Sequence, residues 1–308
     1  MNSVAAVVVT FNRLNELKKN LEMLQLQTRK PDAIYVIDNA STDDTSKYLA
    51  DLANSNNLIT HVLLEKNVGG AGGFSYGYEK ACEDGYDWIW LMDDDGRPQN
   101  DKTLEILMDV AEKESNYSLI NCNVLYNGND LSFKIGTQYN TLEEQRENIE
   151  NGIIENCACV FNGSLIGKSV YEKIGTIKKE YFIRGDEVEF MMRCKNNGVK
   201  VLTVIESLYF HPKTEYAHLS FLGKAFDYEC MAVWKQFFLI RNYVATYNTT
   251  ANPEQKKTIK KGLELIILGV IIHDKSLKRL HYCFKAIREG KSGIFDNHFR
   301  GIENDKKK

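Results

Sequence analysis

The sequence predicts an α/β protein with a doubly wound, mostly parallel central sheet and helices on both of its faces. Short apolar runs alternate with stretches of helical periodicity from residue 4 to residue 93, which is the pattern of successive β-α units. The runs are almost continuously apolar, as in strands covered on both sides. Polar loops follow the strands, at the sheet edge where such folds bind ligands. We expect this domain to span residues 1–215 and a helical C-terminal extension to span residues 216–308.

The first half of the chain reads as four strands, each of the first three followed by a helix. The strands are expected at 4–10, 33–38, 61–65 and from residue 88 onward. Leucines at helical spacing mark the first helix, namely Leu14, Leu17, Leu21 and Leu24. The second helix carries Tyr48 and Leu49, with Ser41 or Thr42 available to cap it. The third follows the glycine-rich loop at 67–74 and runs to about residue 83.

The second half mixes strands and helices and then becomes helical. We expect a helix at 101–114, a strand at 118–125, a hairpin arm at 131–139 and a surface helix or loop at 141–151. An apolar, strand-like stretch at 157–162 is broken by Gly163 and Ser164. A helix after Asp186 and a strand at 199–205 complete the domain. From Ala225 onward strand signals stop, and helices are expected at 226–247, 253–273 and 275–290.

Length and composition are those of a globular protein and exclude several classes. The chain has 308 residues, of which 43% are hydrophobic and 26% charged, with a net charge of −3. This charge carries no nucleic-acid signature, so no nucleic-acid partner is expected. No apolar stretch reaches the roughly 18–20 residues of a membrane span. The seven Cys lack CxxC pairing and no signal peptide begins at Met1, so we expect a cytoplasmic protein with reduced thiols.

The run from Trp88 to Pro98 contains the most specific chemical signal. A short apolar strand ends in Asp93, Asp94 and Asp95, and Gly96 then interrupts regular structure. Three adjacent carboxylates repel one another, so a buried strand that ends in them needs a compensating cation. Oxygen donors suit Mg²⁺ or Mn²⁺. The alternative is a solvated acidic turn, since Asp is a common turn residue.

The loop Asn67–Phe74 (NVGGAGGF) has two interpretations. Its glycines, Gly70 among them, expose backbone at a helix N-terminus, which favours close approach of a bound sugar. Alternatively, they allow the helix to pack tightly on a strand. The loop lacks the spacing of a P-loop and of a GxGxxG fingerprint, and it follows the third strand instead of the first, so we do not expect a dinucleotide- or ATP-binding loop.

A second acidic cluster, Asp186 and Glu187, begins the helix that precedes the last predicted strand of the domain. Carboxylates at a helix N-terminus are stabilised in their charged form, so the pair is either a capping pair or a source of a catalytic base. His211 follows the strand at 199–205. It is either structural or, if the Asp cluster holds a metal, the nearest nitrogen ligand.

The C-terminal helices combine aromatic and basic residues. A basic face beside an apolar one is typical of a helix on anionic lipid headgroups; a merely solvated face is the alternative. We therefore expect peripheral contact with the inner face of the plasma membrane, and oligomerisation remains open.

Four motifs, in order, resemble those of family 2 glycosyltransferases of the GT-A fold. They are VVVTFNR at 7–13, IDNASTD at 37–43, NVGGAGGF at 67–74 and LMDDD at 91–95, and the resemblance covers residues 4–215. Within this family the glycine-rich loop, the triple Asp and the run DEVEF at 186–190 are most similar to bacterial galactofuranosyltransferases. Rhamnosyltransferases are close relatives.

The resemblance implies a nucleotide-binding role for the loops after the first strands. Thr10, Asn12 and Asp38 would frame a uridine, with Asp38 near the uracil edge and Arg13 near the diphosphate. Asp94 would lie close to the ribose or the donor sugar. The donor would be a sugar nucleotide such as UDP-galactofuranose, and the acceptor a growing cell-surface glycan or a lipid-linked glycan.

The resemblance also implies the metal ligands and the catalytic base. Asp93, Asp95 and His211 would hold Mn²⁺ or Mg²⁺. Glu187 falls at the position of the base, but the order Asp186–Glu187 departs from the common pattern and leaves either residue as a candidate. An acceptor hydroxyl needs a positioned base, and a single displacement would invert the anomeric centre.

Other function classes compete with this hypothesis. A rhamnosyltransferase that uses dTDP-rhamnose is the nearest, and a non-catalytic sugar-nucleotide-binding protein is the alternative from another class. A nucleotidyltransferase would carry a basic glycine-rich loop directly after the first strand, where this chain has FNR. Glycoside hydrolysis would explain carboxylate pairs but not the nucleotide-site loops.

Overall fold

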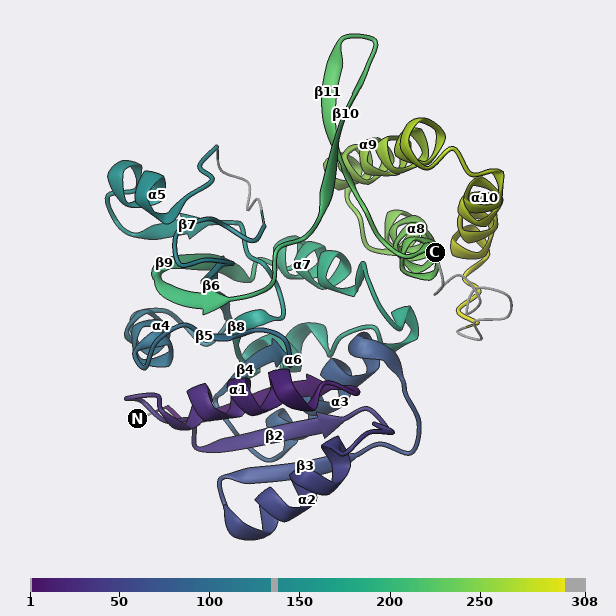
Figure 1. Cartoon of the computed structure of the whole chain (residues 1–308). Helices are drawn as coiled ribbons and strands as arrows, with labels where there is room; N and C mark the ends of the chain where they lie inside the picture. Colours follow the sequence, from purple (N-terminus) through teal and green to yellow (C-terminus); the bar gives the residue numbers. More distant parts are fainter. Residues whose placement is uncertain (1, 134–137, 297–308) are drawn as a thin grey trace. The chain divides into compact units, whose positions relative to one another are not determined.

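The structure is a computed structural model that describes residues 2–133 and 138–296 (Figure 1). The chain divides into two compact units. The first consists of Met1–Lys179 and Cys194–Lys213, and the second of Glu180–Arg193 and Thr214–Lys308. The chain therefore passes between the units three times. The segment 180–193 belongs with the C-terminal residues, although the sequence places it among the residues of the first domain.

A twisted sheet forms the centre of the first unit, in the order β3-β2-β1-β4-β8-β6-β9-β5, with β7 paired to β9. Its strands are β1 (Val4–Thr10), β2 (Ala33–Asp38), β3 (Ile59–Leu63), β4 (Trp88–Asp93), β5 (Arg97–Pro98), β6 (Ser118–Leu125), β7 (Ile153–Glu155), β8 (Asn162–Gly167) and β9 (Lys200–Phe210). The first four strands are parallel, and β8 then pairs antiparallel with β4 and with β6. The predicted fold class is confirmed.

Helices cover both faces of the parallel half because successive side chains of a strand point to opposite faces. On one face Val4, Ala6 and Val8 join one apolar cluster with the leucines of α1 (Leu14–Gln25), α2 (Thr45–Ser55) and α4 (Thr103–Ala111). On the other face α3 (Gly69–Glu83) lies against Val7 and Val9. The unit also contains α5 (Leu142–Asn148) and α6 (Lys168–Ile174). A 3-10 turn (Lys179–Tyr181) begins at its residue Lys179 and continues into residues of the second unit.

The second unit is a helical cluster with a β-hairpin. The hairpin pairs β10 (Tyr216–Phe221) with β11 (Lys224–Glu229) and is drawn in Figure 1 as an arm that extends from the helices of this unit. The helices are α8 (Val233–Thr249), α9 (Pro253–Gly269) and α10 (Leu277–Ser292), with a π-helical turn, η2 (Val270–Asp274), between the last two. The helix α7 (Asp186–Asn196) begins in this unit and ends in the first. The apolar core of the second unit contains Phe182, Phe237, Phe238 and Tyr228.

Four predicted elements differ from the structure. Residues 157–161 are not a strand, and Gly163 and Ser164 lie inside β8. Gly163 adopts φ +71°, and a side chain there would collide with Cys122 and Tyr209, so this glycine allows tight strand packing instead of breaking the strand.

The predicted helical start at 226 is wrong because Leu222 and Gly223, both at positive φ, turn the chain into a hairpin. Neither Ser41 nor Thr42 caps α2, which follows Asp44. The hairpin arm at 131–139 lies partly outside the described residues, and Leu131 forms only an isolated bridge to Leu125.

The C-terminal helix boundaries are otherwise close to prediction. Pro253 occupies the first turn of α9, and Asn252 caps it through the backbone amides of Glu254 and Gln255. Within the described residues, no helix combines the length and apolarity needed to cross a bilayer.

Candidate functional site

The carboxyl ends of β1, β2 and β4 meet at one edge of the first unit's sheet, where the sequence predicts ligand binding. Thr10 pairs with Asp38 across β1 and β2, and Val9 pairs with Asp93 across β1 and β4. The backbone amide of Asn39 donates to the carbonyl of Thr10 at 2.9 Å. The polar loops that follow these strands are thus neighbours, as the parallel register requires.

Asp94 is held by the end of β1 and is almost fully buried. Its Oδ2 accepts a 2.8 Å hydrogen bond from the Thr10 hydroxyl and a 3.3 Å bond from the Phe11 amide, and its Oδ1 lies 3.2 Å from Arg13 Nη1. Burial raises the pKa of Asp94 to about 6, although Arg13 and Thr10 act in the opposite direction. The structure therefore brings together three residues predicted to bind the nucleotide sugar: Thr10, Arg13 and Asp94.

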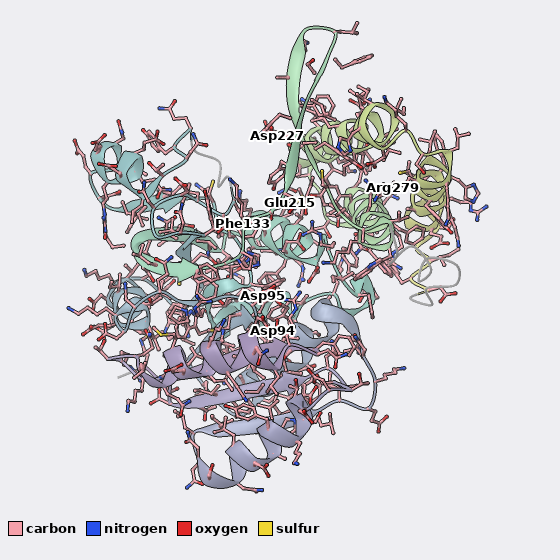
Figure 2. The ribbon with its side chains drawn as sticks, viewed as in Figure 1. Asp94, Asp95, Phe133, Glu215, Asp227 and Arg279 are labelled. Carbon is pink, nitrogen blue, oxygen red and sulfur yellow. The ribbon has the colours of Figure 1, made fainter. Side chains whose placement is uncertain are left out.

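Asp95 lies between Arg13 and His211. It forms an ion pair with the Arg13 guanidinium on one side. On the other side its Oδ1 is 3.7 Å from His211 Nε2. Figure 2 shows Asp94 and Asp95 side by side at this edge. The pairing of Arg97 with Phe210, between β5 and β9, brings the Asp turn and His211 together across more than 110 residues of sequence.

The His211 ring is oriented by its own neighbourhood. Its Nδ1 is 2.7 Å from the carbonyl oxygen of Pro212, and a carbonyl can only accept, so Nδ1 carries the proton. When the ring is neutral, its lone pair therefore lies on Nε2, the atom that faces Asp95. The ring also contacts Phe133, with 4.9 Å between centroids, and the backbone is fixed by bonds to Leu125 and Ser132. A metal-ligating His commonly has this arrangement, with its second nitrogen bonded to a carbonyl.

The donor set fits a divalent cation in part. Asp95 Oδ1 and His211 Nε2, 3.7 Å apart, are a carboxylate oxygen and an imidazole nitrogen within reach of a common point, which suits Mn²⁺ or Mg²⁺. Among residues 2–133 and 138–296, no three His, Cys, Asp or Glu side chains are preassembled as a metal site. Asp93 as a third ligand stays a prediction. Two protein ligands are compatible with a metal that completes its shell with phosphate oxygens and water.

The loop after β2 connects Asn12 with Asp38. Asn12 Oδ1 accepts from the Thr42 amide at 2.7 Å, and the Asn12 amide donates to the Ser41 hydroxyl. Asp38 is fully buried, accepts from the Ser41 amide at 2.8 Å and from the Ser46 hydroxyl, and lies 3.5 Å from His61. Burial by itself raises the pKa of Asp38, but these hydrogen-bond donors outweigh burial and lower the pKa to about 2. Direct contact between Asp38 and the uracil of a bound nucleotide stays a prediction. The observed hydrogen bonds of Asp38 stabilise the loop after β2.

The glycine-rich segment is the first turn of α3 instead of a loop. Asn67 Oδ1 accepts from the Gly69 amide at 2.8 Å and so shapes the entry to the helix. A Cβ on Gly70 would meet nothing within 4 Å, whereas one on Gly73 would lie 2.5 Å from Val9. The two interpretations of this segment therefore apply to different glycines. Gly73 serves helix–strand packing, and Gly70 is the one with open space for a ligand.

Asp186 and Glu187 open α7, as predicted, within the second unit. Asp186 is 5% exposed and Glu187 is half-buried. The third acidic residue of this turn, Glu189, is fully buried and bonded to Arg193 and to the Thr250 hydroxyl. Glu189 thus anchors the helix, which leaves Glu187 as the most accessible carboxylate of the turn. The catalytic role of either residue stays a prediction.

Sequence reasoning missed residues that support the predicted ones. Asn39 bridges the loops: its Nδ2 donates to the Gly69 carbonyl at 2.9 Å, and its Oδ1 accepts from the Val68 amide at 2.8 Å. His61 and Ser46 surround Asp38. The position of Asn39 directly after a buried strand was a usable signal, but the contacts of His61 and Ser46 depend on the register of β3 and α2.

The sequence is similar to those of known proteins. The model of the family "Glycosyl transferase family 2" matches residues 5–175. Galactofuranosyltransferase GlfT1 of Mycobacterium tuberculosis is 37% identical over 215 residues, covering 68% of this chain and 70% of the relative. The GlfT1 of Mycolicibacterium smegmatis is 33% identical over 218 residues, with 68% and 70% covered. The dTDP-rhamnosyl transferase RfbF of Shigella flexneri is 27% identical, with 65% and 66% covered.

A solved structure shares the fold. It is the mannosyltransferase PcManGT from Pyrobaculum calidifontis in complex with GDP-Man and Mn²⁺, with a TM-score of 0.53 and 14% identity, covering 94% of this chain and 75% of that one. The match of the family model over more than half of the chain, together with the GlfT1 relatives, identifies the protein as a glycosyltransferase. The chain belongs to glycosyl transferase family 2.

Proposed function

We propose that the protein transfers galactofuranose from UDP-galactofuranose, with inversion and with a divalent cation, to a glycan or lipid-linked acceptor. The observation that carries this proposal is the pair Asp95 and His211, at the sheet edge formed by Thr10, Arg13 and Asp94. Similarity to the two GlfT1 proteins supports the choice of donor. The similarity to a dTDP-rhamnosyl transferase makes dTDP-rhamnose the second candidate.

Asp95 and His211, with Asp93 as a predicted third ligand, would hold Mn²⁺ or Mg²⁺. When bound, the ion would supply charge stabilisation to the departing diphosphate. Arg13, which pairs with Asp94 and Asp95, is placed to exchange a carboxylate for a phosphate oxygen when the donor enters. Asn12 and Asp38 would keep the loop after β2 in shape for the uridine. Gly70 would let the backbone approach the sugar.

The acceptor hydroxyl must lose its proton as the new bond forms, because its pKa lies far above neutrality. We propose Glu187 as the general base, since it is the more exposed of the two candidates and sits in the first turn of α7. A carboxylate in the first turn of a helix also interacts favourably with the helix dipole. Asp186 is the alternative base.

The test is a turnover assay with UDP-galactofuranose and Mn²⁺, in which UDP release is measured with and without a lipid-linked glycan acceptor. Asp95→Asn is expected to remove metal-dependent donor binding. Glu187→Gln is expected to bind donor normally and to lose about 10²–10⁴-fold in turnover, the usual contribution of a general base. Glu264→Gln, an exposed carboxylate on α9, is the matched control and should be unchanged.

Three results would contradict the proposal. Full turnover in the presence of a chelator would exclude the metal. Near-normal turnover of Glu187→Gln would move the base to Asp186 or elsewhere. Release of dTDP from dTDP-rhamnose, with no release of UDP from UDP-galactofuranose, would replace the donor.

A further inference from the structure

The outward face of α10 carries large apolar side chains among cations. Residues at spacings of three and four share one side of a helix, and here they are Leu277, His281, Phe284, Arg288 and Lys291. We call these five residues the α10 face. All are exposed, with Leu277 at 84% and Phe284 at 58%. The opposite side packs on α8, where the backbone of Gly290 approaches Val244.

The charge of this region is opposite in sign to that of the whole chain. Residues 253–296 contain twice as many Lys and Arg as Asp and Glu, whereas the chain has a net charge of −3. The α10 face itself contains no acidic residue. The acidic Glu289 lies beside it and is paired with Lys285 at 3.8 Å. Arg288 and Lys291 are exposed cations on a face without acidic residues, which favours contact with an anionic surface.

A surface pocket next to the α10 face adds apolar area. It has a volume of about 280 Å³, and its lining is Val270, Ile271, Lys275, Ser276, Leu277 and Leu280. Ile271 is 52% exposed at its rim, and Lys275 supplies a further exposed cation. Arg279, labelled in Figure 2, is not counted among the exposed cations of this region. Its guanidinium donates to Asp274 and to the carbonyl of Met231. It holds the π-helical turn that forms the pocket wall.

We propose that the α10 face and its pocket dock on an anionic phospholipid bilayer. Leu277, Phe284 and Ile271 insert between headgroups, and Lys275, Arg288 and Lys291 meet lipid phosphates. Apolar insertion and charge attraction add in such binding, and the face offers both. This inference extends the proposed function by giving the enzyme a place beside a lipid-linked acceptor.

The experiment is co-sedimentation of the full chain with vesicles of phosphatidylcholine mixed with phosphatidylglycerol, and with vesicles of phosphatidylcholine alone. We expect partition onto the anionic vesicles only, weakened by salt. The triple change Lys275→Ala, Arg288→Ala, Lys291→Ala should lower the partition coefficient about a hundredfold, at about fivefold per cation. The double change Leu277→Ser, Phe284→Ser should also weaken binding. The control is Lys19→Ala, Lys47→Ala, Lys113→Ala, which removes as many exposed cations from the first unit.

The outcomes separate this inference from the proposed function. No partition at low salt, or an equal loss in the control variant, overturns the docking surface. If the double Ser variant instead converts a dimer to a monomer in sedimentation velocity, with no vesicle binding by the original chain, the face is a self-association surface. Acceptor-free hydrolysis of UDP-galactofuranose, measured on the same variants, reports on the proposed function alone and should not change.

A separate set of contacts concerns the segment that precedes the proposed base. Phe182, Arg184 and Gly185 all have positive φ, at +66°, +65° and +84°. Non-glycine residues seldom adopt this conformation unless surrounding contacts impose it. The segment leads directly into Asp186 and Glu187. Its shape therefore decides where the first turn of α7 presents these carboxylates.

Two neighbouring buried residues of α8, Arg241 and Asn242, make the contacts that hold this segment in its conformation. Asn242 Nδ2 lies 2.9 Å from the carbonyl of Tyr181, 3.2 Å from that of Ile183 and 2.7 Å from that of Arg184. Arg241 Nη2 donates to the Tyr181 carbonyl at 3.1 Å, and its Nε donates to Asn242 Oδ1 at 3.0 Å. Both side chains have no exposed surface. Backbone carbonyls of the segment 181–184 thus accept hydrogen bonds from two side chains of one helix, α8.

We infer that Asn242, oriented by Arg241, is a positioning residue for the carboxylates at the start of α7. Asn242 donates where the turn offers only acceptors, and no other uncharged side chain of its size supplies two such protons. The inference rests on the proposed role of Glu187 or Asp186. A misplacement of about 1 Å in a catalytic group can cost about a hundredfold in rate.

The test compares Asn242→Ala with Val244→Ala, a buried change on the same helix whose side chain lies against α10 instead of the turn. We expect Asn242→Ala to lower kcat by up to about a hundredfold while KM for the donor changes little. Val244→Ala should lower the thermal midpoint with kcat preserved. Asn242→Asp, which places acceptors against carbonyls, should be at least as impaired as Asn242→Ala.

Glu187→Gln and Asp186→Asn are measured in parallel. If both remain active, the proposed base is wrong and the positioning role falls with it. If one is inactive but Asn242→Ala keeps its kcat, only the positioning role is overturned. An equal loss of kcat in Val244→Ala would also overturn it, because general loosening of the helix would then explain the effect.

Discussion

Asp38 ends β2 and Asp94 follows β4, the two strands on either side of β1. Both residues are buried, but their pKa values shift in opposite directions. Asp38 accepts from the Ser41 amide and the Ser46 hydroxyl and lies beside His61, and its pKa is about 2. Asp94 is bonded to Thr10 and Arg13, but burial dominates and its pKa is about 6. Each value follows from the number and orientation of local donors and not from residue type.

Asp38→Asn tests the first of these environments. The folded pKa of about 2 lies below the ordinary value of 3.8, so the ionised carboxyl contributes stability above pH 4 and loses it as the pH falls from about 4 to 2. A shift of nearly two units corresponds to about 2 kcal/mol. We expect the variant to lose about 2 kcal/mol in free energy of unfolding at pH 7, and the difference to narrow below pH 4. Denaturant titrations at several pH values measure it; a difference that is constant with pH would contradict the assignment.

At the scale of elements, α3 shows how one glycine-rich sequence serves two purposes. Gly73 and Gly77 lie against Val9 and Val7 of β1, where no Cβ fits without displacement. Gly70, in the same helix, faces open space. The close approach of α3 to β1 places the N-terminus of the helix beside the ends of β1 and β2. Asn39 completes this placement through its bonds to Val68 and Gly69.

Gly73→Ala and Gly70→Ala form a matched pair of changes on this helix. Gly73→Ala is expected to destabilise the protein by about 1–3 kcal/mol through overpacking against Val9. Gly70→Ala should leave stability unchanged or raise it by up to about 1 kcal/mol, since Ala favours helix. If the sugar approaches this backbone, Gly70→Ala should raise KM for UDP-galactofuranose. Thermal unfolding and donor titration measure the two effects; equal destabilisation by both changes would refute the division of roles.

At the scale of the whole molecule, two compact units carry different chemistry. The first contains the sheet edge with Thr10, Arg13, Asp94, Asp95 and His211, and the second contains Asp186, Glu187 and the basic C-terminal helices. The segment 180–193 belongs to the second unit because α8 binds its backbone carbonyls. The residues proposed to bind the donor and the residue proposed as the base therefore belong to different units of the chain.

A thermal-shift screen of nucleotides tests donor selection on the intact chain. A ligand that binds only the folded state stabilises it by about 2.7 kcal/mol at a free concentration about 100 times its Kd. We expect UDP with Mn²⁺ to raise Tm, and UDP or Mn²⁺ alone to raise it less. Asp95→Asn should abolish the joint effect. A larger shift with dTDP and Mn²⁺ than with UDP and Mn²⁺ would favour the rhamnosyl donor.

The order of residues was enough to predict the strands of the parallel half, the edge at which their loops meet, and the family. It could do so because buried parallel strands are continuous apolar runs, and because the polar motifs follow them directly in the chain. Only the folded structure shows that Gly73 packs against a strand whereas Gly70 faces open space. It also shows where the hairpin after Lys213 turns. The difference in pKa between Asp38 and Asp94 likewise depends on their surroundings in the folded protein. Tertiary structure also decided that Asn242, more than fifty residues after Asp186, binds the turn before it. These properties depend on side chains brought together from distant parts of the chain, and no local pattern records them.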